Sequence, residues 1–424
     1  MKISLSAPVI SRDNLRSICS WLATATLLCA ATNLTAQSVL VGSPKTTLTP
    51  RIIQNDSAPD PSSSNVIAGP ETATTYELGQ IKLRPQLQLR YMQANGLPTG
   101  VGANKDTSIS TFAPGVTLEL GSSWILNYTP TWVKYSEPTL TDSTSQSFNL
   151  NGAAKTSNWT LQYGESFQSS QDIMAQTATQ TKQHSWDTTF SASREFGQRS
   201  KYDGTLALNE LYGDIFPDSK TWTTSHRLSS QITKKLNAGL GVTLGKIDFD
   251  SQDDMHYEQY SASIRWQSTE KIDLSIEGGF ENRHFDTPGV GTLRSPTLQA
   301  SLGYHPFEHT RISVTGIHAV STSYLSSELV RNDGWSVSLN QRLLEKLNLS
   351  MSYNDQSNDY KGYATSNLPT VRKDTYKSFN TSLGVRLLKH WTLSAIYQNT
   401  KNTSDNAGFG FATVQYGIEL SGGF

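Results

Sequence analysis

Apolar and polar residues alternate along the carboxyl-terminal stretch of the chain. The apolar positions run from Val414 to Leu420 in steps of two, Gly422 interrupts them, and the terminal Phe424 resumes them. Side chains of a β-strand point to opposite faces in turn, so this period predicts a strand with one apolar face. Soluble antiparallel sheets alternate in the same way, so the pattern alone leaves the environment of the strand open.

The same alternation recurs through most of the chain from residue 81 onward. Trp124, Leu126 and Tyr128, for example, alternate with Ile125 and Asn127. Each such segment predicts a strand with one mainly apolar face. Equivalent segments are 159–163, 240–244, 260–267, 298–304, 335–340 and 379–387.

Short turn sequences separate these strands in pairs, at an interval of about 37 residues that suits a two-strand unit. They lie at 121–123, 152–157, 197–200, 234–237, 268–271, 306–309, 344–346 and 388–390. Eight turns and two terminal strands give about 18 antiparallel strands. Looser connections, rich in Gly, Pro and Asp, lie between the turns at 95–105, 169–182, 214–220, 286–291 and 359–369.

Short turns at one edge of the sheet and longer loops at the other are typical of membrane barrels. The pattern therefore predicts an all-β fold, a transmembrane antiparallel up-and-down β-barrel. A β-propeller or a solenoid is a second interpretation, which we disfavour because no blade motif recurs.

Tryptophans fall at the ends of the predicted strands and in the apolar register. Indole rings favour the headgroup level of a membrane, so we expect two aromatic girdles. In a soluble sandwich, tryptophans would instead lie in the middle of strands. The girdle beside the short turns would contain Trp124, Trp159, Trp266 and Trp391, and the girdle beside the loops would contain Trp186, Trp222 and Trp335.

Composition supports a barrel over a soluble sheet. Apolar residues make up 36% of the chain, which is little for burying a large core. A barrel with lipid outside and water inside needs only one apolar residue in two. After residue 36 the sequence has no apolar run long enough for a transmembrane helix.

The amino terminus has the pattern of a cleaved signal peptide, 1–36. Lys2, Arg12 and Arg16 precede an apolar stretch at 18–31, and 34–36 ends in a small residue. A membrane anchor is disfavoured because the apolar run is short. Loss of this segment, with Asp13, removes a charge of +2 and changes the formal net charge from −1 to about −3, which argues against nucleic acid as a partner.

Both cysteines lie inside the predicted signal peptide. A lipoprotein signal at Cys29 is disfavoured because Leu28 is bulky, so the mature chain contains no thiol. Residues 37–79 are rich in Ser, Thr, Pro, Asn and Asp and predict a disordered periplasmic tail, or alternatively a partial plug of the lumen. The barrel then spans 80–424.

The polar register of the strands would face the lumen. Basic and acidic members on opposite sides suit a wet pore for small polar solutes or ions, whereas ion pairs that only stiffen the wall are the alternative. Lys82, Arg84 and Arg90 on the first strand would meet Glu419 on the last strand and Glu119 on the second. The predicted lumen residues are Lys82, Arg84, Arg90, Glu119, Arg227, Arg265, Asp273, Glu277, Glu281, Arg283, Arg311, Arg342, Arg386 and Glu419.

Signals for catalysis, metal ions or cofactors are weak, and we expect neither an enzyme nor a bound cofactor. The histidines lack H-E-x-x-H spacing. His226 and His284 fall in the outward register, but the sequence names no nucleophile beside them. The acidic stretch 248–254 lacks the Gly and Glu of an EF-hand, which favours a solvated loop or bridging to lipopolysaccharide phosphates.

Several stretches resemble an outer-membrane β-barrel porin family whose relatives accompany exopolysaccharide loci. The resemblance is carried by 89–91, 112–118, 126–128 and 135–136, and again by 304–306 and 310–314. It implies a Gram-negative outer-membrane barrel in contact with lipid and lipopolysaccharide. A channel for small polar solutes is the first hypothesis, and a closed structural barrel that partners a polysaccharide export complex is the second.

The carboxyl-terminal strand resembles the closing strand of bacterial outer-membrane barrels, in which a terminal Phe on alternating apolar residues is read by the insertion machinery. The residues of this expected insertion signal are Tyr416, Ile418, Leu420 and Phe424.

Overall fold

The computed structural model describes residues 75–250, 253–323, 328–344, 346–362, 370–388 and 390–423. The predicted signal peptide, most of the predicted tail 37–79, and Phe424 of the predicted insertion signal lie outside these residues. Within them, Tyr76–Leu78 at the end of the tail range forms strand β1, which pairs with the start of β2.

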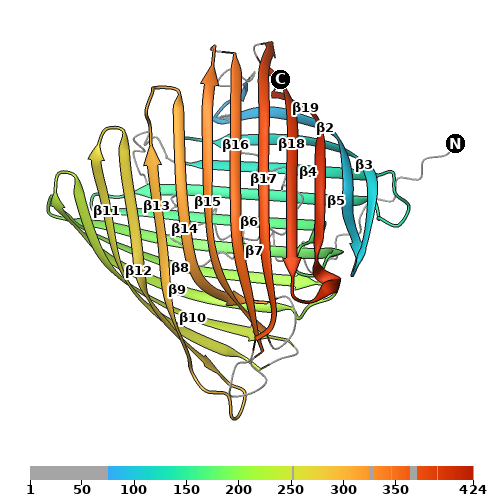
Figure 1. Cartoon of the computed structure of the whole chain (residues 1–424). Helices are drawn as coiled ribbons and strands as arrows, with labels where there is room; N and C mark the ends of the chain where they lie inside the picture. Colours follow the sequence, from blue (N-terminus) through green and yellow to red (C-terminus); the bar gives the residue numbers. More distant parts are fainter. Residues whose placement is uncertain are drawn as a thin grey trace. The chain divides into compact units, whose positions relative to one another are not determined.

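Eighteen long antiparallel strands of the described chain, β2 to β19, form one closed sheet, as the sequence predicts (Figure 1). Each strand pairs with the next in sequence, and β19 pairs with β2 to close the ring. A closed ring leaves no unpaired edge. The strands are β2 Ile81–Gly100, β3 Ala103–Leu120, β4 Trp124–Tyr135, β5 Ser143–Lys155, β6 Trp159–Met174, β7 Thr179–Phe196, β8 Ser200–Gly213, β9 Ser219–Thr233, β10 Leu236–Phe249, β11 Met255–Thr269, β12 Ile272–Phe285, β13 Leu293–Tyr304, β14 Thr310–Thr322, β15 Glu328–Leu343, β16 Leu347–Gly362, β17 Thr370–Leu388, β18 Trp391–Ser404 and β19 Phe411–Gly423, with a 3-10 turn η1 at Ala407–Phe409.

The two edges of the barrel differ in their connections. All eight predicted short turns join strands at one edge, the upper edge of Figure 1, where the carboxyl terminus also lies. We call this edge the turn side and the opposite edge the loop side. Gly121 and Gly197 open two of the turns with φ of 63° and 62°, a conformation that glycine adopts without steric cost.

The predicted loops at 95–105 and 169–182 are much shorter in the structure, which is a correction. β2 runs to Gly100 and β3 begins at Ala103, and only 175–178 separate β6 from β7. Gly96, with φ of 73°, lies where the β2–β3 register shifts. The Gly-containing segment therefore forms a β-bulge inside a hairpin, where the sequence predicts a loop.

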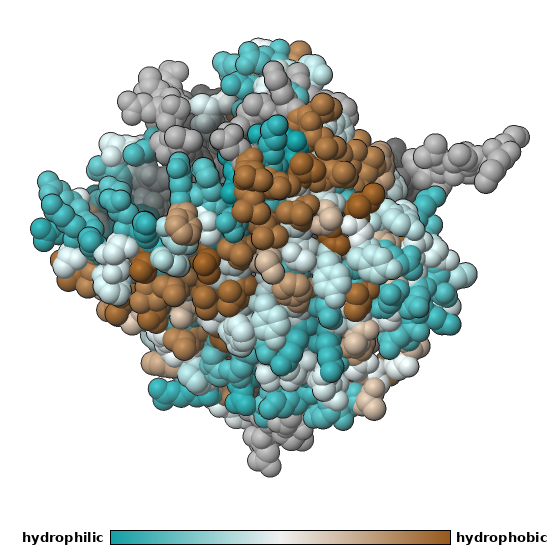
Figure 2. Space-filling model, turned by 45° about the horizontal axis from the view of Figure 1, so that its top comes forward, coloured by the Kyte–Doolittle hydropathy of each residue, from teal (hydrophilic) through white to brown (hydrophobic). Residues whose placement is uncertain are grey.

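Large apolar side chains gather on the outer face of the barrel. Leu240 and Ile418 are 70% and 57% exposed. Figure 2 shows broad zones of hydrophobic side chains across one view of this face, with hydrophilic side chains along its lower edge. No helix among the described residues is long and apolar enough to cross a membrane.

Gly422, the interruption in the last apolar register, lies beneath a tryptophan. It is the cross-strand partner of Trp391 on β18. A Cβ at this position would lie 2.6 Å from the Trp391 indole and 2.4 Å from the His390 carbonyl oxygen. Trp124 lies over Gly152 in the same way, with 2.3 Å to such a Cβ. Tryptophans of the turn-side girdle thus pack against glycines of the neighbouring strand.

The loop-side tryptophans lie deeper in their strands than predicted. Trp222 is near the start of β9, but Trp186 and Trp335 lie well inside β7 and β15, so their expected place at strand ends is wrong. Aromatic partners accompany them, with ring centroids 4.5 Å apart for Phe167 and Trp186. The strands continue past these rings on the loop side, where the sequence reading ended them.

Apolar clusters inside the barrel lie toward the loop side. Met92 and Ile109, which are cross-strand partners on the inner face, pack with Ile173 from the end of β6. A second cluster joins Met255 and Leu329. The barrel interior is therefore packed with side chains at one end.

Candidate functional site

The charged residues predicted for the lumen occupy the register that faces away from the exposed apolar side chains. Arg90, for example, lies between Leu89 and Tyr91, two exposed residues of the outer face. Because successive side chains of a strand alternate between faces, Arg90 points inward. That these residues line a water-filled passage stays a prediction.

An ion pair joins the first and last strands of the ring. Arg90 Nη2 lies 2.5 Å from Glu419 Oε2, and the Gln88 amide donates to the same oxygen at 2.7 Å. Both charged side chains are largely buried. This is the meeting of strands that the sequence led us to expect. Charged hydrogen bonds of this kind are stronger than neutral ones and fix the register of the seam.

The next inward residues toward the turn side form more exposed contacts. Arg84 Nη2 lies 2.9 Å from Glu119 Oε1, with the two side chains 42% and 25% exposed. Lys82 Nζ is instead 3.9 Å from Oε1 of Glu77, which lies on β1. Water therefore reaches the inner wall at this end.

Arg227 and Glu277 form an ion pair between strands that are not neighbours. Arg227 Nη2 lies 2.6 Å from both carboxylate oxygens, although β10 and β11 separate β9 from β12. Gly241 and Ser261 stand in the register row of Arg227, and Ser263 is the cross-strand partner of Glu277. Small residues between the two partners leave the room for this contact, which sequence spacing alone does not indicate.

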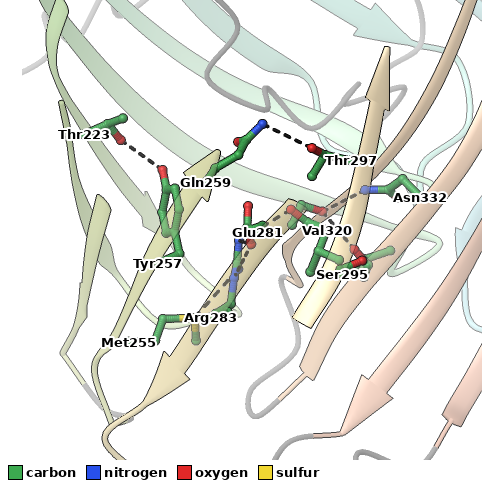
Figure 3. A network of polar contacts seen from close by, with 12 residues as sticks. Thr223, Met255, Tyr257, Gln259, Glu281, Arg283, Ser295, Thr297, Val320 and Asn332 are labelled. Carbon is green, nitrogen blue, oxygen red and sulfur yellow. Dashed lines mark hydrogen bonds and ion pairs between the residues drawn. The ribbon is translucent and has the colours of Figure 1, made fainter. Parts of the chain in front are cut away.

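Arg283 and Glu281 form the most enclosed pair, on β12 toward the loop side (Figure 3). Their side chains are only 2% exposed, and Arg283 Nε donates to Glu281 Oε1 at 2.9 Å. The guanidinium also lies over the Tyr257 ring at 5.2 Å, and Tyr257 shares a 3.1 Å hydrogen bond with Thr223. Asn332 from β15 belongs to the same wall, where it donates to Ser321.

A second enclosed arginine was missed by the sequence reading. Arg372 on β17 lies between the rings of Tyr360 and Phe409, at 3.9 and 4.1 Å, and its Nε is 3.3 Å from Asp374. The sequence predicts this strand only over 379–387, whereas β17 already begins at Thr370, directly after the predicted loop at 359–369. The signal was present, because the polar register of 379–387 continues backward to Arg372 in steps of two.

The β6–β7 hairpin folds inward across the loop-side opening. Its residue Ile173 belongs to the same apolar cluster as Met92 of β2, and β7 comes into contact with β2, which is not its neighbour in the sheet. At the hairpin tip the Gln176 amide donates to Ser323 at the end of β14, on the far side of the ring. Gln180 also donates to the Thr141 carbonyl at 2.8 Å. Side chains therefore bridge the loop-side opening.

The turn side differs, because several predicted arginines there take part in none of the ion pairs within the described chain. Arg265, Arg311 and Arg386 lie on the inner register near the turn-side ends of β11, β14 and β17. Asp273 lies 3.8 Å from His305. Arg342 on β15 also lies on the inner register but is not one of these arginines.

Two carboxylates of the acidic stretch, Asp248 and Asp254, are engaged by a lysine of the same hairpin. Lys246 pairs with Asp248 and lies 3.3 Å from Asp254. Burial acts to raise the pKa of Asp254, but the Phe249 N–H and the Lys246 ammonium outweigh it, so the pKa is lowered. No group of three or more potential metal ligands occurs among the described residues.

The outward histidines have hydroxyl partners. His226 Nδ1 lies 2.7 Å from the Tyr202 hydroxyl, and His284 Nδ1 lies 2.9 Å from Thr292 Oγ1. His284 also stacks on His256, with ring centroids 4.9 Å apart. These contacts fix the imidazole rings on the outer face.

No family model and no curated protein matches the chain. Solved structures of similar architecture include OccAB2 of Acinetobacter baumannii, at 12% identity over 81% of this chain and 98% of that one, with a TM-score of 0.44. OpdQ of Pseudomonas aeruginosa is similar at 8% identity over 82% and 99%, with a TM-score of 0.44. OpdO of Pseudomonas aeruginosa is similar at 13% identity over 81% and 97%, with a TM-score of 0.43.

Proposed function

We propose that the chain is an outer-membrane porin-like channel that passes small polar solutes or ions. The observation that carries the proposal is the polarity of the closed sheet. Its outer face exposes large apolar side chains such as Leu240, whereas its inner face holds ion pairs such as Arg90 with Glu419. A barrel of this polarity suits lipid outside and water inside.

The size of the ring and the state of the inner wall support a passage. Barrels of about 16 to 18 strands leave an aqueous channel unless other segments fill it. Arg84 and Glu119 are accessible to water at the turn side. The β6–β7 hairpin narrows the loop side, so selection among solutes would occur there.

Finer parts of the proposal rest on the sequence. Export would use the signal peptide 1–36, and insertion would use the alternation that ends at Phe424. The tail would occupy the periplasm, and lipopolysaccharide would surround the loop side. A closed barrel that partners an exopolysaccharide export complex is the competing function. The hydrogen bond across the loop-side opening narrows the passage but does not favour an export complex.

Single-channel recording of the folded barrel in a planar bilayer tests the proposal. We expect stable conductance steps, with a reversal potential in a salt gradient that reports the ion preference of the inner wall. A correctly folded barrel that stays silent would overturn the channel and support the closed export-associated role.

A further inference from the structure

A basic cavity lies at the turn-side rim of the barrel. Its volume is about 310 Å³, and it is formed where the β7–β8 turn and the β9–β10 turn stand side by side. Arg265 of β11 contributes from the inner wall. The cavity therefore stands where the inner wall meets the turn-side opening.

Five cations and one carboxylate line this cavity. The residues are Arg199, Lys201, Lys234, Lys235, Arg265 and Glu195. Lys201 is neutralised by Asp203 at 2.6 Å. Even so, the remaining cations outnumber the carboxylate, and their combined field favours an anion.

The arginines and Lys234 are not engaged elsewhere in the described chain. None of its ion pairs or side-chain hydrogen bonds involves the side chains of Arg199, Lys234 or Arg265. Lys235 donates to the Ser268 carbonyl at 2.9 Å, which holds its ammonium at the rim without cancelling its charge. Their donors therefore stay available to a ligand.

Three lysines outside this cavity have carboxylate partners. Lys246 has Asp248 and Asp254, Lys220 has Glu210 at 2.6 Å, and Lys377 has Asp355 at 3.1 Å. The gathering of several cations around one space therefore does not follow from the composition of the whole chain, whose formal net charge is −1.

We propose that this cavity binds a phosphoryl group. A multiply charged anion matches several cations around one space better than a single carboxylate does. Guanidinium groups also match phosphate oxygens through paired N–H donors. The proposal goes beyond the channel function, because binding at the rim needs no open passage.

The site is tested by equilibrium binding of inorganic phosphate to the purified full chain. The chain is folded in a zwitterionic detergent, with chloride as the background anion. Titration calorimetry should show saturable binding. The double variant Arg199→Gln with Arg265→Gln should weaken affinity at least about tenfold. The control variant Lys105→Gln with Lys401→Gln removes the same charge from exposed residues remote from the turns and should change affinity less than about twofold.

Two results would overturn the site. One is the absence of saturable binding by the parent chain, and the other is equal weakening by the site and control variants. If the arginine variant does not fold, Lys234→Glu in the exposed turn replaces it, and unchanged phosphate affinity in that variant would equally reject the site.

The lipid composition of the membrane distinguishes two sources of the phosphoryl group, a soluble anion and a lipid headgroup. Phosphate binding that persists in phosphatidylcholine vesicles containing phosphatidylglycerol identifies a soluble anion as the ligand. Binding seen in pure phosphatidylcholine but lost with phosphatidylglycerol, and equally sensitive to the arginine variant, identifies a lipid headgroup. The binding experiment measures no current, so the two proposals can fail separately. A folded barrel that conducts no current would reject the channel function without affecting the proposed phosphoryl site.

Discussion

The two openings of the barrel are built from the same alternating strands but have opposite character. On the loop side, Arg283 and Glu281 are sealed among Tyr257 and other side chains, and the β6–β7 hairpin crosses the opening. On the turn side, Arg84 and Glu119 remain accessible, and Arg265 has no carboxylate partner in the described chain. One opening is packed and neutralised, whereas the other is hydrated and basic.

Strand length explains much of this difference. Turn-side tryptophans such as Trp124 stand at the first residue of their strands, so the sheet ends at that girdle. On the loop side the strands continue past Trp186 and Trp335. The additional residues give hairpins enough length to fold inward, while the short turns have no such reach. Chain length beyond the girdle, more than composition, therefore decides which opening is filled.

The largest effect that separates the two openings is expected from removal of one buried charge. Arg283→Met leaves Glu281 enclosed without its partner and should lower the free energy of unfolding by about 3–5 kcal/mol. Arg84→Met, its turn-side counterpart, should cost less than about 1 kcal/mol because both partners are hydrated. Urea unfolding of the two variants in lipid vesicles measures the difference, and equal costs would contradict the contrast.

A slightly smaller loss of stability is expected on the apolar outer face, which extends between the two openings. Leu298→Arg should lower the free energy of unfolding by about 2–4 kcal/mol if this residue faces lipid near the bilayer centre. Gln299→Arg, on the inner face of the same strand, should have little effect on stability and mainly alter conductance. Similar losses in the two variants would mean that the face assignment is wrong.

Gly422→Val tests the packing of the turn-side girdle. The new side chain would collide with the Trp391 indole and the His390 carbonyl, and such overpacking costs about 1–3 kcal/mol. Ser421→Val, on the inner face beside it, serves as the control. Unfolding midpoints measured by tryptophan fluorescence should fall for the first variant alone, and an unchanged midpoint there would reject the indole-on-glycine contact.

The smallest expected effect concerns the loop-side bridge. Joining Ser170 to Gln183, which are cross-strand partners, through an Asn-Gly turn removes the inward tip of the β6–β7 hairpin. Single-channel conductance should rise about twofold, because the narrowest part of the passage widens. The size limit for neutral polymers that enter the pore should rise with it. An unchanged size limit would show that the constriction lies elsewhere.

The architecture could be predicted from the sequence because period-two alternation and turn residues are local signals. The eight short turns, the strand number and the inward register of residues such as Arg90 all follow from them. The loops could not be placed equally well, because Gly96 reads as a loop but forms a bulge inside a hairpin. Likewise, Gly422 interrupts the apolar register in the sequence, and only the structure shows that this glycine leaves space for the Trp391 indole.

The candidate site was less predictable because its contacts are not local. Arg227 and Glu277 meet across two intervening strands, and the alternation gives no information about such distances. The cavity beside Arg199 and Lys234 forms only when two turns that are separate in sequence stand next to each other. The sequence indicates which face of the sheet each charged residue occupies. Which charged residues come into contact depends on the closure and curvature of the barrel.

The Arg90–Glu419 pair has a consequence for how the chain folds. Its residues are 329 positions apart. Among the side-chain hydrogen bonds of the described wall, only the bond from Gln88 to the same carboxylate spans more of the sequence. Every other strand can pair with the one before it as the chain adds hairpins, but this seam must wait for the last strand. Contacts between residues far apart in the sequence form slowly. We therefore expect closure of the barrel to be the slow step of folding. A chain arrested before that step exposes the edges of β2 and its last paired strand, and open edges recruit other copies.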